Sequence, residues 1–98
     1  MLIDFDSTKN LANIAKHGLP LSFAALFDWN LANIKPDRRA DYGELRMSAV
    51  VPYGLRVYFV AFVDRPQVRR IISLRRANRR EVKKYAAENP PPNVLPAD

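Results

Sequence analysis

Arginine and lysine make up most of the groups in this sequence that could do chemistry. Cys is absent, and His17 is the only histidine. A Cys-ligated zinc site or a His-rich metal cluster therefore cannot be built, and no Ser-His-Asp arrangement can be argued. The three glycines each stand at an expected turn, which leaves no glycine-rich phosphate loop. We expect no cofactor or metal, so any catalysis must use Arg, Lys, Glu, Asp, Tyr and His17.

RNA is a substrate that such side chains can cleave, because its 2′-hydroxyl is a built-in nucleophile. The protein needs only to align that hydroxyl, move its proton and neutralise the charge on the phosphate. His17 titrates near neutrality and is a candidate acid or base. It could equally be a helix C-terminal residue that the helix dipole stabilises. Lys9 lies eight residues earlier and shares roughly the same helix face, either as a second candidate or as a solvent-exposed lysine.

Two further pairs of side chains are candidates for the same chemistry. Glu44 and Arg46 stand two apart on an expected strand and so face one side, either as a base with a phosphate clamp or as an ion pair of about 0–1 kcal/mol. Arg75 and Arg76 end another strand, where they could grip phosphate or meet an acidic partner. Tyr85 could stack on a base or pack in the core. The expected RNA-binding residues are Arg70, Arg79, Arg80, Lys83 and Tyr85.

The positive charge is concentrated in one segment of the 98-residue chain. The net charge is +6, yet residues 1–64 hold seven basic and seven acidic side chains and sum to zero. Residues 65–84 hold nine basic side chains against Glu81 alone, and residues 85–98 contribute −2. A neutral body with one strongly cationic segment is typical of a polyanion binder, with RNA or DNA first among the ligands. The alternative is a solvated basic face that binds an acidic protein.

The first half of the chain is expected to supply one strand and a pair of helices. Residues 2–5 predict a short strand, and residues 7–16 predict an amphipathic helix. Asp6 is its expected N-cap, and Gly18 its C-terminal residue. Its helical spacing comes from Leu11, Ile14 and Ala15. Pro20 is expected to open a second helix that forms a compact hairpin with the first.

The second half predicts strands followed by one helix. Strands are expected at residues 31–35, 44–49, 55–63 and 68–74, with 55–63 as the central strand. Asn78 is the expected N-cap of a last helix over 79–88, and a run of three prolines follows it. The sequence thus predicts one α+β domain over residues 1–88, with a small antiparallel sheet packed with three helices in β-α-α-β-β-β-β-α order. Residues 89–98 form a Pro-rich tail that we expect to be disordered.

Three blocks of sequence carry a resemblance to a known family. They are residues 5–18, which hold Lys9 and Lys16-His17-Gly18, then Gly43-Glu44-Leu45-Arg46, and then Ile72-Ser73-Leu74-Arg75-Arg76-Ala77. In order and spacing they resemble the BrnT family, the toxin halves of type II toxin–antitoxin pairs, and the likeness runs from residue 3 to residue 88. By position, Lys9 and His17 match the first block, Glu44 and Arg46 the second, and Arg75 and Arg76 the third. Two departures are Leu74, where the family usually has Ala, and an apolar second helix where relatives often carry Glu.

The resemblance implies a fold, an activity and partners. The fold would be like that of RelE-type ribonucleases. The activity would be metal-independent RNA cleavage, on free or ribosome-bound RNA, that inhibits translation and growth. The partner would be a BrnA-like antitoxin with a ribbon-helix-helix part in a heteromeric complex, and operator DNA would be bound only through that antitoxin. We expect a cytoplasmic protein without a signal peptide or membrane contact, because no apolar stretch reaches the length of a membrane span.

Two other functions stay open at this point. A non-catalytic binding module, such as an inactive toxin kept as a co-repressor, would use the same basic residues without cleaving anything. A DNA-binding regulator acting alone ranks last, because the sequence shows no helix-turn-helix pattern.

Overall fold

The helices and strands follow one another in the predicted order. The computed structural model describes residues 1–38 and 43–90, so the predicted tail lies outside it from residue 91 onward. The first half holds β1 (Ile3–Phe5), α1 (Ser7–His17), the 3₁₀ helices η1 (Leu21–Leu26) and η2 (Trp29–Leu31), and β2 (Asn33–Pro36). The second half holds β3 (Met47–Tyr53), β4 (Arg56–Arg65), β5 (Val68–Arg76) and α2 (Arg79–Glu88). The α+β prediction is therefore confirmed.

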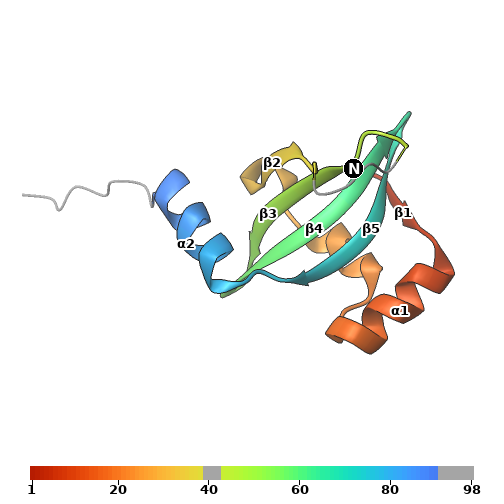
Figure 1. Cartoon of the computed structure of the whole chain (residues 1–98), viewed down its shortest axis with the longest axis horizontal. Coiled ribbons are helices and arrows are strands. Elements are labelled where there is room, and N and C mark those ends of the chain that lie inside the picture. The colour runs from red at the N-terminus through yellow and green to blue at the C-terminus, as the bar shows by residue number, and fades with distance from the viewer. Residues whose placement is uncertain (39–42, 91–98) are drawn as a thin grey trace, which may run out of the picture.

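One five-stranded sheet organises the molecule, in the order β1-β5-β4-β3-β2 (Figure 1). Strands β2 to β5 form an antiparallel meander, as expected. The first strand departs from that expectation because β1 pairs in parallel with β5, Ile3 opposite Arg69, which makes the sheet mixed. A chain that leaves a strand through a helix can return to the same sheet in parallel, whereas a tight hairpin cannot give that direction.

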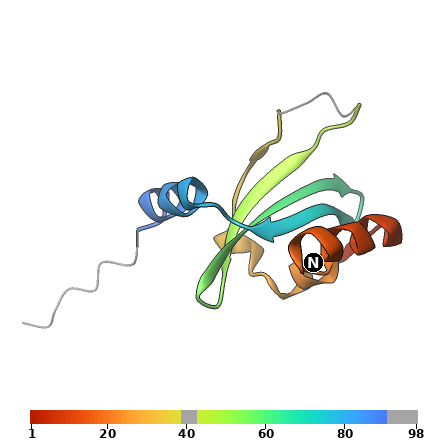
Figure 2. The same cartoon turned by 60° about the horizontal axis from the view of Figure 1, so that its bottom comes forward.

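The hydrophobic core lies on one face of the sheet, beneath the two 3₁₀ helices (Figure 2). Val60 and Phe62 of β4 are fully buried there, as is Leu74 of β5. Leu21 and Phe27, from η1 and its C-terminal end, close this core from the other side. Side chains alternate along a strand, so the neighbours of these core residues point to the opposite face of the sheet.

The segment after Pro20 is 3₁₀ rather than α-helical, which corrects the expected second helix. Pro20 itself is extended, with φ −74° and ψ 148°, and η1 runs for only six residues. Such a short run allows few i→i+4 hydrogen bonds, so the tighter 3₁₀ form is favoured. Phe27 then turns extended and stacks on Tyr58 with ring centroids 5.6 Å apart, which fixes the end of η1 to the sheet.

Helix α1 packs through a polar residue, although its apolar spacing predicted the opposite face. Its buried residue is Asn13, whose amide donates to the carbonyls of Leu19 and Leu74, each at 2.8 Å. The same side chain accepts the Leu74 amide at 3.0 Å, so it completes the edge of β5 beyond the end of β1. Leu11, in contrast, is 68% exposed, and Ile14 is 41% exposed.

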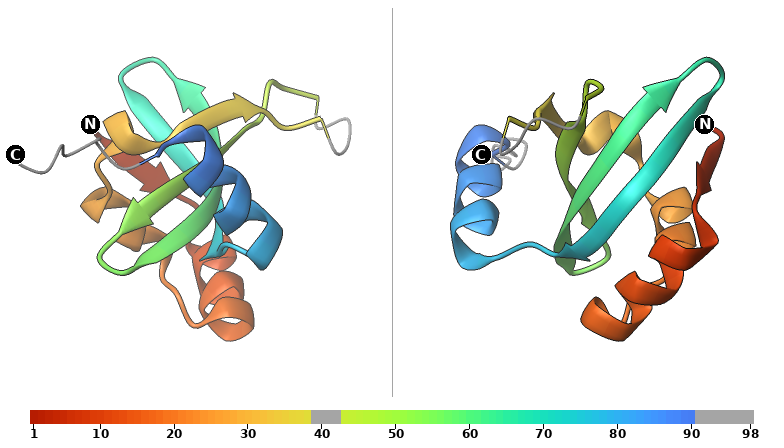
Figure 3. Two further views of the ribbon diagram at one scale, coloured as in Figure 1. Left: turned by 90° about the vertical axis from the view of Figure 1, so that its left-hand side faces the viewer. Right: turned by 45° about the vertical axis from the view of Figure 1, so that its right-hand side comes forward.

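Helix α2 lies on the other side of the sheet from α1 (Figure 3). Asn78 caps it as predicted, and Glu81 completes a capping box by accepting the Asn78 amide at 2.8 Å. None of its residues is buried, and the Tyr85 hydroxyl ties it to the Leu31 carbonyl at 2.6 Å. Within the described residues, no helix has the length and apolar character that a membrane span requires.

Candidate nucleic-acid interface

The sheet face opposite the core collects the basic side chains of three strands. Because Ile71 faces the core, alternation places Arg70 on the opposite face. Arg75 lies beyond the bulge in β5 and pairs with Phe59, which stands between the core residues Tyr58 and Val60, so Arg75 is on that opposite face too. The same rule places Lys35 of β2 on this side, paired with Ser48. Arg46 immediately precedes core-facing Met47 and shares the side. We call this surface, with α2 over one end, the basic face.

Arg75 is held in place by three groups at the α2 end of the basic face. Its two terminal nitrogens bind both carboxylate oxygens of Glu81, at 2.8 and 3.0 Å. The guanidinium also lies 4.2 Å from the centroid of the Phe59 ring, and Nη1 reaches the Arg76 carbonyl at 3.2 Å. A planar guanidinium fixed by a two-pronged carboxylate and an aromatic ring is a pre-oriented phosphate donor. The Arg75 side chain keeps 28% of its surface exposed.

Glu81 is a site residue that sequence reasoning did not select. It was noted only as the one acid among nine basic side chains in residues 65–84. That isolation, together with its place three residues after the N-cap Asn78, was the available signal, because a capping-box Glu sits at a fixed position beside the preceding strand. In the structure Glu81 both closes the first turn of α2 and orients Arg75.

His17 ends α1 close enough to Arg75 to be affected by its charge. Desolvation lowers the pKa of the His17 imidazole below 6.5, and the positive charges of Lys16 and Arg75 lower it further. The imidazole is therefore mainly neutral at pH 7, which is the form that can accept a proton. Two predicted site residues from opposite halves of the chain, His17 and Arg75, are thus coupled through charge.

Arg46 and Arg70 form a second group farther along the basic face. Both stand beside Val63 of β4, Arg70 as its paired residue and Arg46 next to Met47, which pairs with Phe62. Arg70 binds Asp4 at 3.2 Å. The Val63 rung lies four residues of β4 from the rung of Arg75, about 13 Å along the strand. Arg46 and Arg75 are therefore placed to contact different phosphates of one strand.

Three other predicted residues lie away from Arg75. Glu44 precedes β3 and is 3.7 Å from Arg65, about 20 Å along β4 from the rung that holds Arg75. Arg76 follows Arg75 on the strand and pairs with core-facing Tyr58, so it points to the opposite face. Lys9 is exposed and lies two turns before His17, about 12 Å along the α1 axis.

The predicted RNA-binding residues of α2 are mostly exposed. Arg79 and Arg80 stand in the first turn, and Lys83 follows one turn later. Cations near a helix N-terminus oppose the helix dipole, so these two arginines do not stabilise α2. Tyr85 is different, because its hydroxyl is bound to Leu31 and burial raises its pKa. Its role in the fold is to hold α2 over the sheet.

Among the described residues, no group of three or more His, Asp or Glu side chains could hold a metal ion.

Comparison with known proteins completes the description of this face. A search of curated proteins finds no match to the chain. A family model described as "Ribonuclease toxin, BrnT, of type II toxin-antitoxin system" matches residues 5–81. That match spans both halves of the site, from α1 to Glu81, and the chain therefore belongs to the BrnT family of ribonuclease toxins.

Proposed function

We propose that this toxin cleaves RNA without a metal, using the 2′-hydroxyl of the substrate as nucleophile and His17 with Arg75 as the reacting centre. Membership of the family implies an RNA substrate and an antitoxin partner. The observation that carries the proposal is the oriented Arg75 guanidinium at the α2 end of the basic face, whose charge also acts on the neutral imidazole of His17. A base and a cation are what transesterification of RNA needs.

The proposed step transfers two protons and exchanges one bond to phosphorus. His17 takes the proton of the 2′-hydroxyl, whose oxygen attacks phosphorus, and the bond from phosphorus to the 5′-oxygen breaks. The 5′-oxygen takes a proton from water, which leaves a 2′,3′-cyclic phosphate and a 5′-hydroxyl, and the His17 imidazolium returns its proton to the hydroxide. Arg75 stabilises the charge that develops on the phosphate oxygens. We favour His17 as base over Lys9 and Glu44, because the charge of Arg75 acts on His17, whereas Glu44 lies near Arg65 and Lys9 stands two turns earlier on α1.

The remaining basic residues would hold the RNA strand. Arg46 and Arg70 would bind phosphates about four β-residues away from the cleaved one, and Arg79, Arg80 and Lys83 would track the backbone beside α2. Their support is position, since the first two share a face with Arg75 and the other three are exposed. Arg76, on the opposite face, would contribute only general attraction.

The antitoxin would be a BrnA-like protein with a ribbon-helix-helix part. It would neutralise the toxin by covering the basic face with acidic and apolar residues, and the complex would reach operator DNA through the antitoxin. Charge complementarity supports this placement, because the basic segment is the largest charge imbalance in the chain.

The test is RNA cleavage by the purified full chain in EDTA, with the product ends mapped. We expect fragments that end in 2′,3′-cyclic phosphate. Arg75→Ala and His17→Gln should each lower the rate by about 10²–10⁴-fold, the size of one electrostatic or acid–base contribution. Arg56→Ala removes an exposed arginine of β4 outside the site and should leave the rate unchanged. Wild-type rates in both site variants would contradict the assignment.

One observation favours the alternative of a non-catalytic binding module. Arg75 is already neutralised by Glu81 in a two-pronged ion pair, as a purely structural arginine would be. If intact RNA survives with and without translating ribosomes while the chain still binds it, the alternative holds. Growth arrest that persists in Arg75→Ala would instead show that Arg75 is not the reacting cation.

A further inference from the structure

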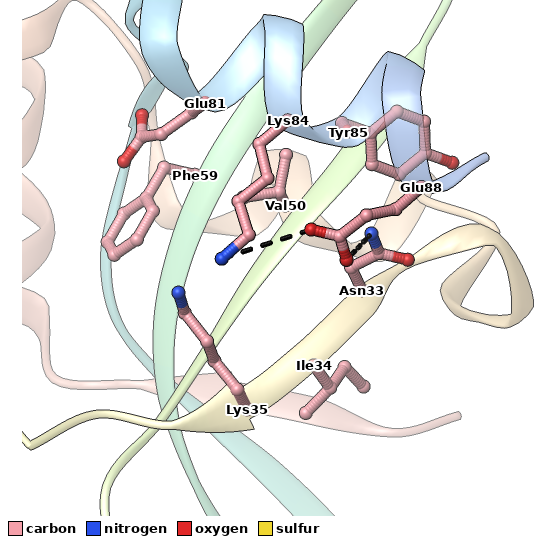
Figure 4. Close-up of a pocket in the computed structure, with 9 residues that line it drawn as sticks. All are labelled: Asn33, Ile34, Lys35, Val50, Phe59, Glu81, Lys84, Tyr85 and Glu88. Carbon is pink, nitrogen blue, oxygen red and sulfur yellow. Dashed lines mark hydrogen bonds and ion pairs between the residues drawn. The ribbon is translucent and has the colours of Figure 1, made fainter. Parts of the chain in front are cut away.

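A cavity lies between α2 and the sheet, next to the Arg75 centre. Its volume is about 140 Å³, and Val50 of β3 and Phe59 of β4 form its floor (Figure 4). The helix supplies the opposite wall through Tyr85, whose hydroxyl is tied to the backbone before β2. The cavity is therefore built by elements that are fixed to one another, with an apolar and aromatic interior.

The size of the cavity selects among aromatic ligands. A protein cavity of about 150 Å³ lined by apolar side chains holds one benzene molecule. The cavity under α2 is of the same size but opens to solvent, so one six-membered ring fills it and the second ring of a purine would lie outside its walls. Among the parts of RNA, a single six-membered aromatic ring means a pyrimidine base.

The rim of the cavity carries polar groups that suit the edge of such a base. Figure 4 shows the amines of Lys35 and Lys84 reaching toward the same space from the sheet and the helix. The Asn33 amide donates to Glu88 at 3.5 Å, and Lys84 lies 3.8 Å from the same carboxylate. Contacts at these distances are weak and can be exchanged for shorter ones to a ligand. The donors match the ring carbonyls of uracil and cytosine, and the carboxylate and amide oxygens match their N–H groups.

The cavity shares two residues with the proposed reacting centre. Phe59 forms its floor and also lies 4.2 Å from the Arg75 guanidinium. Glu81 lines it and binds the same guanidinium through both oxygens. A nucleotide with its base in the cavity therefore carries its phosphate toward Arg75. We propose that this cavity binds one pyrimidine base of the RNA and so sets the nucleotide next to the cleaved bond, an inference that rests on the proposed function.

The first test is a nuclear magnetic resonance titration of the full chain with uridine, adenosine and ribose monophosphates. We expect uridine monophosphate to bind at least about tenfold more tightly than the other two and to shift the backbone amides of Val50 and Phe59. Val50→Phe fills the cavity and should abolish this preference. Val82→Phe adds the same bulk on α2 at a residue that does not line the cavity, and should keep it. Equal affinities for the three probes would overturn the proposal, as would a preference that survives Val50→Phe.

A second pair of variants tests the proposal even if Val50→Phe fails to fold. Lys84→Met removes one rim amine and keeps the aliphatic stem, so the ratio of uridine to adenosine affinity should fall about threefold or more. Lys83→Met makes the same change one residue earlier, outside the cavity, and should keep that ratio whatever it does to both affinities. Equal ratios in the two variants would overturn the proposal.

Failure of this inference and failure of the ribonuclease proposal give different results. The titration requires no cleavage, so a pyrimidine preference that Val50→Phe removes supports the cavity even if RNA stays intact. Cleavage at sites without a pyrimidine preference, unchanged in Val50→Phe, would support the ribonuclease and reject the cavity as its base-binding site.

Discussion

The charge of Arg75 contributes to the lowered pKa of His17. The Arg75 charge is one of three causes that lower the pKa of His17, after desolvation and the charge of Lys16. Residue types and block order were sufficient to name both side chains as candidates. Their electrostatic coupling was not predictable, because it depends on α1 packing against β5, and this contact is made by Asn13 rather than by the apolar spacing of the helix.

Replacing Arg75 should therefore change the titration of His17. In Arg75→Gln we expect the pKa of His17 to rise, while desolvation and Lys16 still hold it below 6.5. Nuclear magnetic resonance of the imidazole measures this directly. Arg46→Gln is the control, because Arg46 is not among the charges that lower the pKa of His17. A pKa that is the same in both variants would mean that His17 and Arg75 are not coupled.

The pH dependence of cleavage and of stability follows from the same lowered pKa. The cleavage rate should fall on acidification as His17 gains its proton, with a midpoint below pH 6.5. The folded state binds this proton less readily than the unfolded chain, so stability should be full above pH 6.5 and decrease as the pH falls through the lowered pKa. Rate profiles and denaturant titrations of the wild type and His17→Gln test both points. A variant that keeps the acidic limb of the rate would exclude His17 as the base.

At the scale of elements, the strands and the last helix were predictable and the packing face of α1 was not. Alternating or continuous apolar runs predicted β3 to β5, with bounds that differ by a few residues from those observed. The capping residues predicted both ends of α1 and the start of α2. Hydrophobic spacing failed for α1, because Asn13 makes hydrogen bonds to β5 that no periodicity encodes. Only the three-dimensional arrangement shows that β5 has an edge that β1 is too short to cover.

Asn13→Ala should therefore destabilise the fold far more than loss of a leucine from the same helix. It leaves the Leu74 amide and the carbonyls of Leu74 and Leu19 without their partner, and each unsatisfied buried group costs about 1–3 kcal/mol. We expect the free energy of unfolding to fall by about 3 kcal/mol or more. Leu11→Ala, at a side chain that is 68% exposed, should cost less than about 1 kcal/mol. Urea titration of the two variants checks the order, and the reverse order would contradict the packing of α1.

Helix α2 should respond locally to loss of its cap. Asn78→Ala removes the side-chain acceptor of the Glu81 amide, a change that costs a helix about 0.5–2 kcal/mol. Because α2 buries none of its residues, we expect faster hydrogen exchange of its amides while the unfolding midpoint of the sheet stays nearly constant. A shift of the global midpoint as large as the local change would show that α2 is part of the cooperative core.

At the scale of the whole molecule, the two faces of the sheet differ in composition. One face holds the core beneath the 3₁₀ helices, and the opposite face carries the basic residues. Charge counting along the sequence identified the cationic segment but not its division, because neighbouring arginines such as Arg75 and Arg76 alternate between faces. The cavity under α2 was beyond prediction for the same reason, since its lining comes from strands and a helix far apart in the chain.

Binding of single-stranded RNA to the basic face should depend steeply on salt. Each phosphate contact contributes about −0.7 to the slope of log affinity against log salt concentration. The double variant Arg79→Gln, Arg80→Gln should therefore reduce the slope by about 1.4, as measured by fluorescence anisotropy with a labelled oligonucleotide. Arg56→Gln should leave the slope unchanged. Equal slopes in all three proteins would place the RNA away from α2.

The pairing of β1 with β5 has a consequence for the nascent toxin. His17 leaves the ribosome about 60 residues before Arg75, which at about 5–20 residues per second is a delay of roughly 3–12 s. During that interval α1 has no β5 edge to bind, since the Asn13 contacts require Leu74. A chain interrupted anywhere before β5 thus lacks both the anchor and the guanidinium. With Arg75 as the reacting cation proposed above, a nascent chain is therefore expected to cleave RNA only after β5 has been synthesised.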